Sequence, residues 1–452
     1  MCRARIRCLP RPPEDAITSR CRVTALRLRH LLVLGVALVS CTPPAPKLPP
    51  AAPGLAPASH DDEWTASLAP ASPESVGVEP AKLALLAEWV LQATDVPIFS
   101  ILVSRKGKLV FELYTSKLDR DDAHYVMSAT KSFTSCLVGI AIDRGLLAGP
   151  EESVADALPR DLFASDGERE RFRGVTLKDV LAMSALDAQV PPHELGPEAR
   201  ARQRAFLASD NRVRFALTQR LLPEPGVSFQ YTDVTPLIAI GAVEYAARES
   251  GFEFAKEALF GPLGFRNEEW MHSDESGTDN GAYGLRVRPI DMQKLGLLYL
   301  NRGSWNGRRV VSEKWIDTSF TPWIRSKDTL RTPNYGWYWW ARRFGASTAH
   351  VANGWKGQRI AVVPDRELVV TMTGAIEPNA REDEVFRHVM EDFVVPALAP
   401  GPLPPQPEAD ARLAADLRDV NDKAMRVGGG MEARMIPSRE PKERHRTFSA
   451  GR

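Results

Sequence analysis

A serine and a lysine three positions apart form the first pair in this sequence that could do covalent chemistry. Ser128 and Lys131 begin a segment whose apolar residues recur at intervals of three and one: Phe133, Cys136, Leu137, Ile140 and Ala141. This spacing puts one apolar stripe along a helix and predicts that the helix is anchored in a core. Ser128 then lies in the first turn, with Lys131 one turn later on the same face. The hydroxyl therefore meets a nearby amine and the positive end of the helix dipole.

Such a pair suits nucleophilic attack on a carbonyl group. A serine hydroxyl is a poor nucleophile until a base takes its proton. Lys131 can act as that base if burial and cationic neighbours lower its pKa until the amine is neutral. The backbone N–H of Ser128 would then point at the carbonyl oxygen as it becomes an oxyanion.

The Ser-x-x-Lys motif is short, and a helix-capping serine followed by a solvated lysine is the plain alternative. Three features favour catalysis: the motif occurs once in the chain, it opens an apolar-striped helix, and a strand hairpin precedes it. A competing serine, Ser347, lies in a Gly-Ala-Ser-Thr-Ala stretch that resembles a Gly-x-Ser-x-Gly elbow. That stretch lacks the final glycine and leads into a predicted strand rather than a helix, so we discard it.

A tyrosine in a later loop is the second catalytic candidate. Pro225-Gly226 predicts a turn that leads to Tyr231 and Asp233, just before an apolar helix predicted at 236–247. A phenol beside the serine and lysine could pass the proton to the leaving group. Taken alone, Tyr231 is explained equally well as a loop residue that covers the edge of the core. Tyr299 lies in an amphipathic helix predicted at 290–300, where core packing explains it better.

A glycine-rich turn is the third candidate element. Gly354, Trp355, Lys356 and Gly357 separate two predicted strands. The backbone N–H of Trp355 could serve there as the second oxyanion donor. Without the other two elements, an ordinary hairpin would be the better interpretation.

The elements that position these residues come from both halves of the chain. Residues 98–104 and 108–114 predict a strand hairpin, and helical patterns dominate from 128 to 260. Strand patterns return at 336–343, 349–353, 358–363 and 368–373, and a helix follows at 382–395. We therefore predict an α/β (α+β) fold. One antiparallel sheet is built from both chain halves and flanked by helices, with an inserted helical region at roughly 147–275.

The N-terminus carries the pattern of an export signal. Basic residues precede an apolar run from 31 to 39, and Leu38-Val39-Ser40-Cys41 resembles a bacterial lipobox, which predicts lipidation of Cys41. Ordinary signal cleavage nearby is the alternative. Residues 1–41 form this signal, although residues 1–21 are unlike a signal peptide and translation is expected to start near Val23. The protein is thus expected to be exported and anchored by lipid, facing the periplasm or the cell exterior.

The rest of the chain divides by composition. Residues 42–63 are rich in Pro and Ala and predict an extended linker. Residues 64–398 form the predicted catalytic domain. Residues 399–452 are Pro-rich and then charged, which predicts a mostly disordered tail.

Composition also excludes some functions. The formal net charge of +1 argues against a nucleic-acid partner. The eight histidines show no metal-ligand spacing, so we expect no metal and no other cofactor. Only Cys136 would stay free in a mature lipoprotein, and its helix face predicts a small buried hydrophobe without a disulfide. The sequence gives no indication of the oligomeric state.

Together these motifs resemble the serine β-lactamase-related family, over roughly residues 72–398. This family includes class C β-lactamases, D-alanyl-D-alanine carboxypeptidases of the penicillin-binding type, esterases and 6-aminohexanoate-dimer hydrolases. The resemblance implies a β-lactamase/transpeptidase-like fold, with Ser128 and Lys131 as its Ser-x-x-Lys and Tyr231 as the tyrosine of its Tyr-x-Asn. It also implies that Asp233, Gly354, Lys356 and Gly357 contact the substrate.

Two departures from the family pattern bear on the substrate. Asp233 stands where the family often has Asn, and the Lys-Thr-Gly strand is replaced by Gly354-Trp355-Lys356-Gly357-Gln358. The latter form is similar to the branch that contains 6-aminohexanoate-dimer hydrolases and esterases. Both departures weaken a penicillinase interpretation, although Lys356 could stand in for the missing lysine.

We therefore expect a serine hydrolase that acts through an acyl-enzyme on small esters or linear amides. A D-alanyl-D-alanine carboxypeptidase or a weak class C-type β-lactamase is the second hypothesis. An acylatable sensor or an inactive surface-binding module is the third, although every expected catalytic side chain is present.

Overall fold

The structure, a computed structural model, describes residues 68–93, 95–115, 120–187, 197–325, 334–377 and 379–424. Cys41, the export signal and the linker predicted at 42–63 lie outside these residues. No helix in the described part of the chain is both long and apolar enough to cross a bilayer.

An antiparallel sheet joins the two halves of the chain, as the sequence predicted. Its strand order is β2-β1-β13-β12-β11-β10-β9-β8. In that order the strands are Lys108–Tyr114, Ile98–Arg105, Leu368–Gly374, Gln358–Val363, Ser347–Gly354, Trp340–Phe344, Asn334–Tyr335 and Ile324–Arg325. The early strand β1 lies between β2 and β13, and Ile101 pairs with Met372. The strand that ends at Gly354 therefore belongs to the same sheet as the first hairpin.

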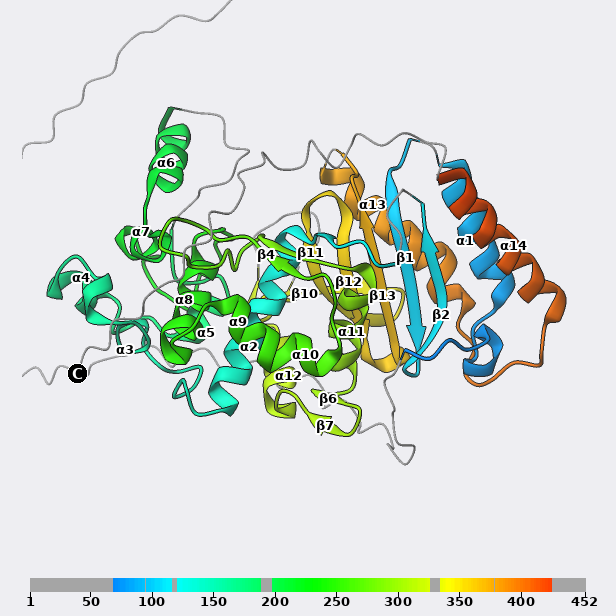
Figure 1. The fold of residues 1–452 in the computed structure, drawn as a ribbon, viewed down its shortest axis with the longest axis horizontal. Helices are drawn as coiled ribbons and strands as arrows, with labels where there is room; N and C mark the ends of the chain where they lie inside the picture. Colours follow the sequence, from blue (N-terminus) through cyan, green and yellow to red (C-terminus); the bar gives the residue numbers. More distant parts are fainter. Residues whose placement is uncertain are drawn as a thin grey trace, which may run out of the picture. The chain divides into compact units, whose positions relative to one another are not determined.

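Helices cover both faces of the sheet because the strand side chains alternate between two cores. Ile101 and Val103 pack with α1 (Pro80–Gln92), α13 (Asn379–His388) and α14 (Pro407–Ala424). The neighbouring Leu102 packs into the other core, with α2 (Thr130–Asp143), α8 (Thr235–Ala247) and α11 (Pro289–Leu300). Figure 1 shows α1 and α14 together on one side of the sheet, and α2 and α11 on the other. The β1 and β13 strands are accordingly buried along their whole length.

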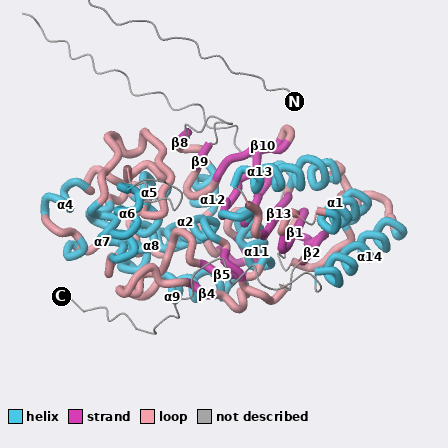
Figure 2. The backbone as a smooth tube through the Cα atoms, turned by 90° about the horizontal axis from the view of Figure 1, so that it is seen from above, coloured by secondary structure: helices cyan, strands magenta, loops and turns pink. Residues whose placement is uncertain are grey.

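The remaining elements lie mostly between the first hairpin and the later strands. Figure 2 shows α4 to α8 gathered at the end of the sheet opposite to α1 and α14. The helices of this region are α3 (Val154–Ala157), α4 (Asp166–Arg171), α5 (Leu177–Leu181), α6 (Pro197–Ala208), α7 (Arg212–Thr218), α9 (Gly251–Ala255), α10 (Gly261–Leu263) and α12 (Glu313–Phe320). Short strands β3 (His124–Tyr125), β5 (Leu285–Val287) and β4 (Glu269–Trp270) form a second sheet, and β6 (Ser304–Trp305) pairs with β7 (Arg308–Arg309).

Two expectations from the sequence need correction. Residues 407–424, predicted to belong to a mostly disordered tail, form α14, because Leu413 and Val420 bury their side chains in the core that α1 also enters. The strand predicted at 336–343 begins only at Trp340. A Cβ on Gly336 would overlap the backbone oxygen of Ser319, so the chain passes tightly against the end of α12 before it joins the sheet.

Candidate active site

The serine lies in a tight turn that leads into α2. Met127–Ala129 form a single 3-10 turn, and Thr130 begins the α-helix. Met127 has φ 50°, in the left-handed region. This conformation is unfavourable for any residue other than glycine, so the surrounding packing must hold it in place. The first twelve residues of α2 are all buried, so the helix is fixed in the core while Ser128 stays partly exposed. The nucleophile predicted from the sequence is therefore accessible and held on a rigid element.

Lys131 is almost fully buried beside this serine, with 1% of its surface exposed. Its Nζ donates hydrogen bonds to Ser128 Oγ at 3.0 Å, to Asp233 Oδ1 at 2.7 Å and to the backbone oxygen of Ala282 at 2.9 Å. Three acceptors satisfy the three donors of an ammonium group. Burial lowers the pKa of Lys131, but the charge of Asp233 and the phenol of Tyr231 outweigh it, so the pKa is raised above its ordinary value.

This raised pKa corrects an expectation from the sequence. The amine was predicted to become neutral through burial and cationic neighbours, yet its charged neighbour is the carboxylate of Asp233. In this state Lys131 is an ammonium that donates to Ser128 Oγ and orients the hydroxyl. It cannot accept the serine proton until its own proton has left.

Tyr231 joins this pair from the loop before α8. Its ring centroid lies 5.0 Å from Lys131 Nζ. Aromatic neighbours hold the ring in place: the centroid of Trp340 is 5.8 Å away and that of Tyr335 is 6.5 Å away. The structure therefore brings together Ser128, Lys131, Tyr231 and Asp233, whose proximity the sequence could only suggest.

Three further residues around this site, Ala282, Asn280 and Tyr283, were missed by sequence reasoning. The backbone oxygen of Ala282 accepts a hydrogen bond from Lys131, and the buried Asn280 holds this turn by accepting from the N–H groups of Ala282 and Tyr283, each at 3.1 Å. Burial raises the pKa of Tyr283, and the nearby charge of Asp233 adds to the rise. An Asn-Gly turn was visible in the sequence at Asn280, but a backbone oxygen leaves no side-chain pattern to find.

The third predicted element lies directly against the serine turn. Gly354 ends β11, and a Cβ at this position would overlap the backbone oxygen of Val126 and approach the backbone nitrogen of Ala129 at 3.2 Å. Only a glycine lets the two backbones come this close. Trp355, the next residue, is 37% exposed. Its backbone follows directly after the residue that contacts the serine turn, so its N–H stays a candidate oxyanion donor.

A buried glutamine ties this turn to the strand before the serine. Gln358 Nε2 donates to the backbone oxygens of Trp355 at 3.0 Å and Gly374 at 2.7 Å. Its Oε1 lies 2.8 Å from His124 Nε2. Burial lowers the pKa of His124 to about 4, so the ring is neutral at ordinary pH and Nε2 carries the donated proton. Gln358 therefore links three backbone segments around the site.

Lys356 takes part in a different interaction from the one that the resemblance implied. Its Nζ lies 2.7 Å from Glu377 Oε1 and 4.6 Å from the centroid of the Trp355 ring. The left-handed φ of 65° at Lys356 shapes the turn. In this structure the ammonium of Lys356 is already paired, and a substrate carboxylate would have to compete with Glu377.

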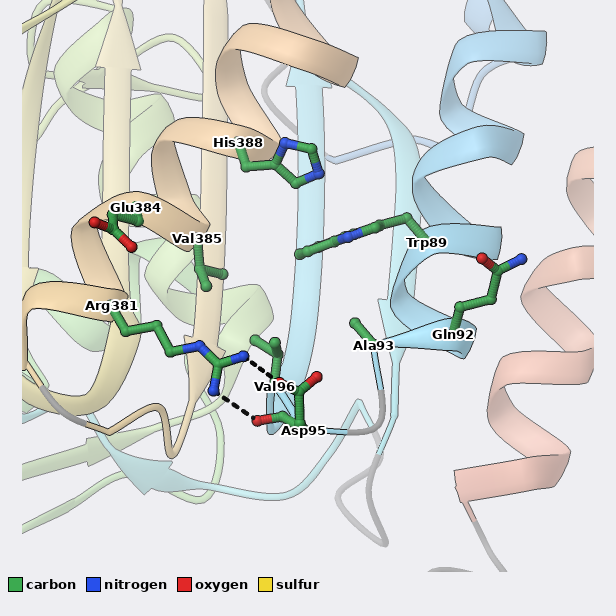
Figure 3. A pocket seen from close by; sticks show the side chains of 9 residues that line it. All are labelled: Trp89, Gln92, Ala93, Asp95, Val96, Arg381, Glu384, Val385 and His388. Carbon is green, nitrogen blue, oxygen red and sulfur yellow. Dashed lines mark hydrogen bonds and ion pairs between the residues drawn. The ribbon is translucent and has the colours of Figure 1, made fainter. Parts of the chain in front are cut away.

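A cavity of about 430 Å³ lies elsewhere, between the end of α1 and α13. Figure 3 shows the rings of Trp89 and His388 side by side in its lining, with centroids 4.8 Å apart, and the ion pair of Arg381 and Asp95 further along it. None of the site residues described above lines this cavity. It is therefore separate from the serine site.

Family comparison identifies the family of the chain. The sequence model of the family described as Beta-lactamase matches residues 86–392, a span that contains Ser128, Lys131, Tyr231 and Gly354. The chain belongs to the beta-lactamase family. A 6-aminohexanoate-dimer hydrolase of Paenarthrobacter ureafaciens is 23% identical over 302 residues, which are 62% of this chain and 74% of that protein.

Several solved structures share the fold. A penicillin-binding protein homolog from Caulobacter crescentus gives a TM-score of 0.54 at 15% identity, over 70% of this chain and 98% of that one. A simvastatin synthase mutant from Aspergillus terreus gives 0.53 at 19% identity, with the same coverage of 70% and 98%. The β-lactamase/transpeptidase-like fold expected from the motifs is therefore confirmed. The chain is a serine hydrolase of the beta-lactamase family.

Proposed function

We propose that this hydrolase acts through an acyl-enzyme at Ser128 on small esters or linear amides. The observation that carries the proposal is the hydrogen bond of 3.0 Å from the buried Lys131 Nζ to the partly exposed Ser128 Oγ, at the start of a fixed helix. A hydroxyl beside a sequestered amine is the arrangement that serine activation requires. The partial exposure of Ser128 leaves room for a carbonyl group to approach.

In the proposed acylation step, Ser128 Oγ attacks the carbonyl carbon while its proton passes to a neutral Lys131. The lysine must first lose the proton that it donates to Asp233, and the partly exposed carboxylate gives this proton a path to solvent. Tyr231 then relays a proton to the leaving oxygen or nitrogen as its bond to carbon breaks. The N–H groups of Ser128 and Trp355 stabilise the oxyanion. Water attacks the acyl ester, the acid leaves, and the serine hydroxyl is restored.

The charges around the site support esters and linear amides over penicillins. A β-lactam carries a carboxylate that needs a cation, but Lys356 is paired with Glu377 and Asp233 adds a negative charge. One relative is named as a hydrolase of the 6-aminohexanoate dimer, which agrees with this substrate class.

The test compares the wild type with Ser128→Ala on p-nitrophenyl esters, a linear amide, a D-Ala-D-Ala peptide and nitrocefin. We expect ester or linear-amide turnover in the wild type and a loss of at least about 1,000-fold in Ser128→Ala, because the nucleophile is removed. A fluorophosphonate probe should label the wild type and leave Ser128→Ala unlabelled.

Ser347→Ala is the matched control, because Ser347 is the competing serine of the sequence and accepts a hydrogen bond from Arg366 at 2.8 Å, away from the site. It should keep both labelling and turnover. Undiminished turnover in Ser128→Ala would overturn the proposed nucleophile. Nitrocefin as the best substrate by a wide margin would overturn the preference for esters and linear amides.

Export and lipid anchoring at Cys41 form a separate part of the proposal. The basic, apolar and small-residue pattern that ends in Leu38-Val39-Ser40-Cys41 supports it. Labelled palmitate should enter the wild-type protein and not Cys41→Ser. Equal labelling of the two proteins, or none in either, would contradict lipidation at this residue.

A further inference from the structure

We propose that Glu382 is a positioning residue that, together with Arg359, holds the turn Trp355–Gly357 in place against the serine turn. The inference rests on the proposed function, in which the N–H of Trp355 is an oxyanion donor. It adds a residue that has no contact with the nucleophile and that the sequence motifs did not indicate. The argument depends on what Glu382 binds and on what the turn requires.

Glu382 binds the backbone of the turn with both of its oxygens. It lies in α13 and is 4% exposed. Oε1 accepts from the N–H of Lys356 at 2.7 Å, and Oε2 accepts from the N–H of Gly357 at 3.2 Å. One carboxylate therefore fixes two successive peptide groups directly after Trp355.

The turn needs such an anchor because two of its residues have an unfavourable backbone conformation. Lys356 has φ 65° and Gly357 has φ 98°. A lysine rarely adopts the left-handed conformation without support from its surroundings. Successive N–H groups in such a turn converge on one point and favour a negative charge there. The Glu382 carboxylate occupies that point.

Arg359 extends this anchor to the other side of the turn. Its guanidinium is 2% exposed, pairs with Glu382 Oε2 at 3.0 Å, and donates to the backbone oxygens of Gly354 and of Gln358, the latter at 3.1 Å. Gly354 in turn lies against the backbone of Val126 in the serine turn. The ion pair thus ties both ends of the turn and fixes its distance from Ser128.

A neighbouring carboxylate provides the control. Asp383 also pairs with Arg359, at 3.2 Å, and with Arg342, at 3.2 Å. Its bonds therefore go to arginine side chains rather than to the turn. Asp383→Asn removes a charge from the same helix and the same arginine, but it leaves the anchor of the turn intact.

The experiment measures how strongly the enzyme prefers an ester over the matching thionoester, in which sulfur replaces the carbonyl oxygen. Sulfur is larger and accepts hydrogen bonds weakly, so a well-aligned oxyanion hole favours the ester. This ratio of rates is independent of how much of the protein is folded. It therefore reports alignment of the donors and not stability.

In Glu382→Gln the side chain keeps one accepting oxygen, and an NH2 group replaces the other. The turn therefore loses one of its two hydrogen bonds to this side chain, and Arg359 loses the negative charge with which it pairs. We expect kcat for the ester to fall about 10- to 100-fold, somewhat less than the loss of a whole oxyanion donor. KM should stay within about threefold, and the ester-to-thionoester ratio should fall about tenfold. Asp383→Asn should keep the wild-type ratio.

Glu382→Asp is the second variant. It retains the charge but is one methylene shorter, so its ratio should lie between those of the wild type and Glu382→Gln. A wild-type ratio in Glu382→Gln would overturn the inference even if its kcat were low. Absence of folded protein in both variants would assign Glu382 to fold stability and overturn it as well. Failure of the wild type itself to hydrolyse esters would instead count against the proposed function.

Discussion

The ion pair between Lys131 and Asp233 decides the protonation state of the amine beside the nucleophile. The groups that face this amine are Ser128, Asp233, Tyr231, Tyr283 and the backbone oxygen of Ala282. Among them Asp233 supplies the carboxylate of the ion pair. The pKa of Lys131 is raised above the ordinary lysine value of about 10.4. The amine therefore stays protonated at neutral pH unless the ion pair with Asp233 opens. Activity that uses Lys131 as a base should therefore increase with pH.

Replacing this carboxylate by the amide that related proteins often carry tests the argument. In Asp233→Asn the burial that lowers the pKa of Lys131 is no longer opposed by a negative charge, so the pKa falls. The acidic limb of the kcat/KM profile should move to lower pH by about one unit or more. Asp365→Asn, which alters an exposed carboxylate, should leave the profile unchanged. An unmoved acidic limb in Asp233→Asn would mean that Lys131 is not the titrating base.

At the scale of single residues, the sequence predicted the contacts that lie within one turn of a helix. Ser128 and Lys131 could be paired from their spacing alone, since a helix brings such positions together. The partners of Lys131 could not, because Asp233 and Ala282 lie 102 and 151 residues away along the chain. Their approach depends on how α8 and the later loops pack. For the same reason the raised pKa of Lys131 was beyond sequence reasoning.

At the scale of the elements, the end of β11 lies so close to the serine turn that it leaves no space for a side chain. Gly354→Ala places a methyl group on the backbone of Val126, and the two segments must separate. Because small misplacements of catalytic groups are costly, we expect kcat to fall about 100-fold and the melting temperature to decrease. Gly174→Ala is the control, since a Cβ there meets no atom within 4 Å. Full activity in Gly354→Ala would show that this contact does not align the site.

Regular elements were the part of the fold that the sequence predicted best. The hairpin at 98–114 and the strands near 349–353, 358–363 and 368–373 agree with β1, β2, β11, β12 and β13 to within two residues at each end. The segment at 336–339 was misread because its aromatic rings alternate as they would in a strand. Here Trp337 and Trp339 are buried within a loop, and Tyr338 has φ 63°, a left-handed conformation outside the β region.

At the scale of the whole molecule, α14, the last described helix, packs onto α1. Leu413 is 5% exposed and belongs to the core that contains Leu83 and Leu86 of α1. Leu413→Ala should lower the free energy of unfolding by about 2–4 kcal/mol, because a buried leucine is replaced and a cavity remains. Arg418→Ala, at an exposed position of the same helix, should change it by less than about 0.5 kcal/mol. Urea denaturation measures both, and equal midpoints would contradict the packing of α14.

The sequence held a signal for this helix that its composition obscured. Leu413, Leu417 and Val420 recur at helical spacing, but Pro-rich residues precede them and charged residues surround them. A short amphipathic stripe is stable only where another surface covers it. That surface is α1, more than 300 positions earlier, as the contact of Arg412 with Glu88 across 324 positions illustrates.

The position of β1 between β2 and β13 also governs when activity can arise during synthesis. A chain that has grown past Lys131 carries the reactive pair, yet the strands that complete the sheet beside it are still unmade. A premature stop before Leu368 leaves β1 without its partner β13, and a stop before Trp355 also removes the turn that lies against the serine turn. Ester turnover is therefore expected only from nearly complete chains, so a chromogenic ester would distinguish colonies that make the long product from those that make fragments.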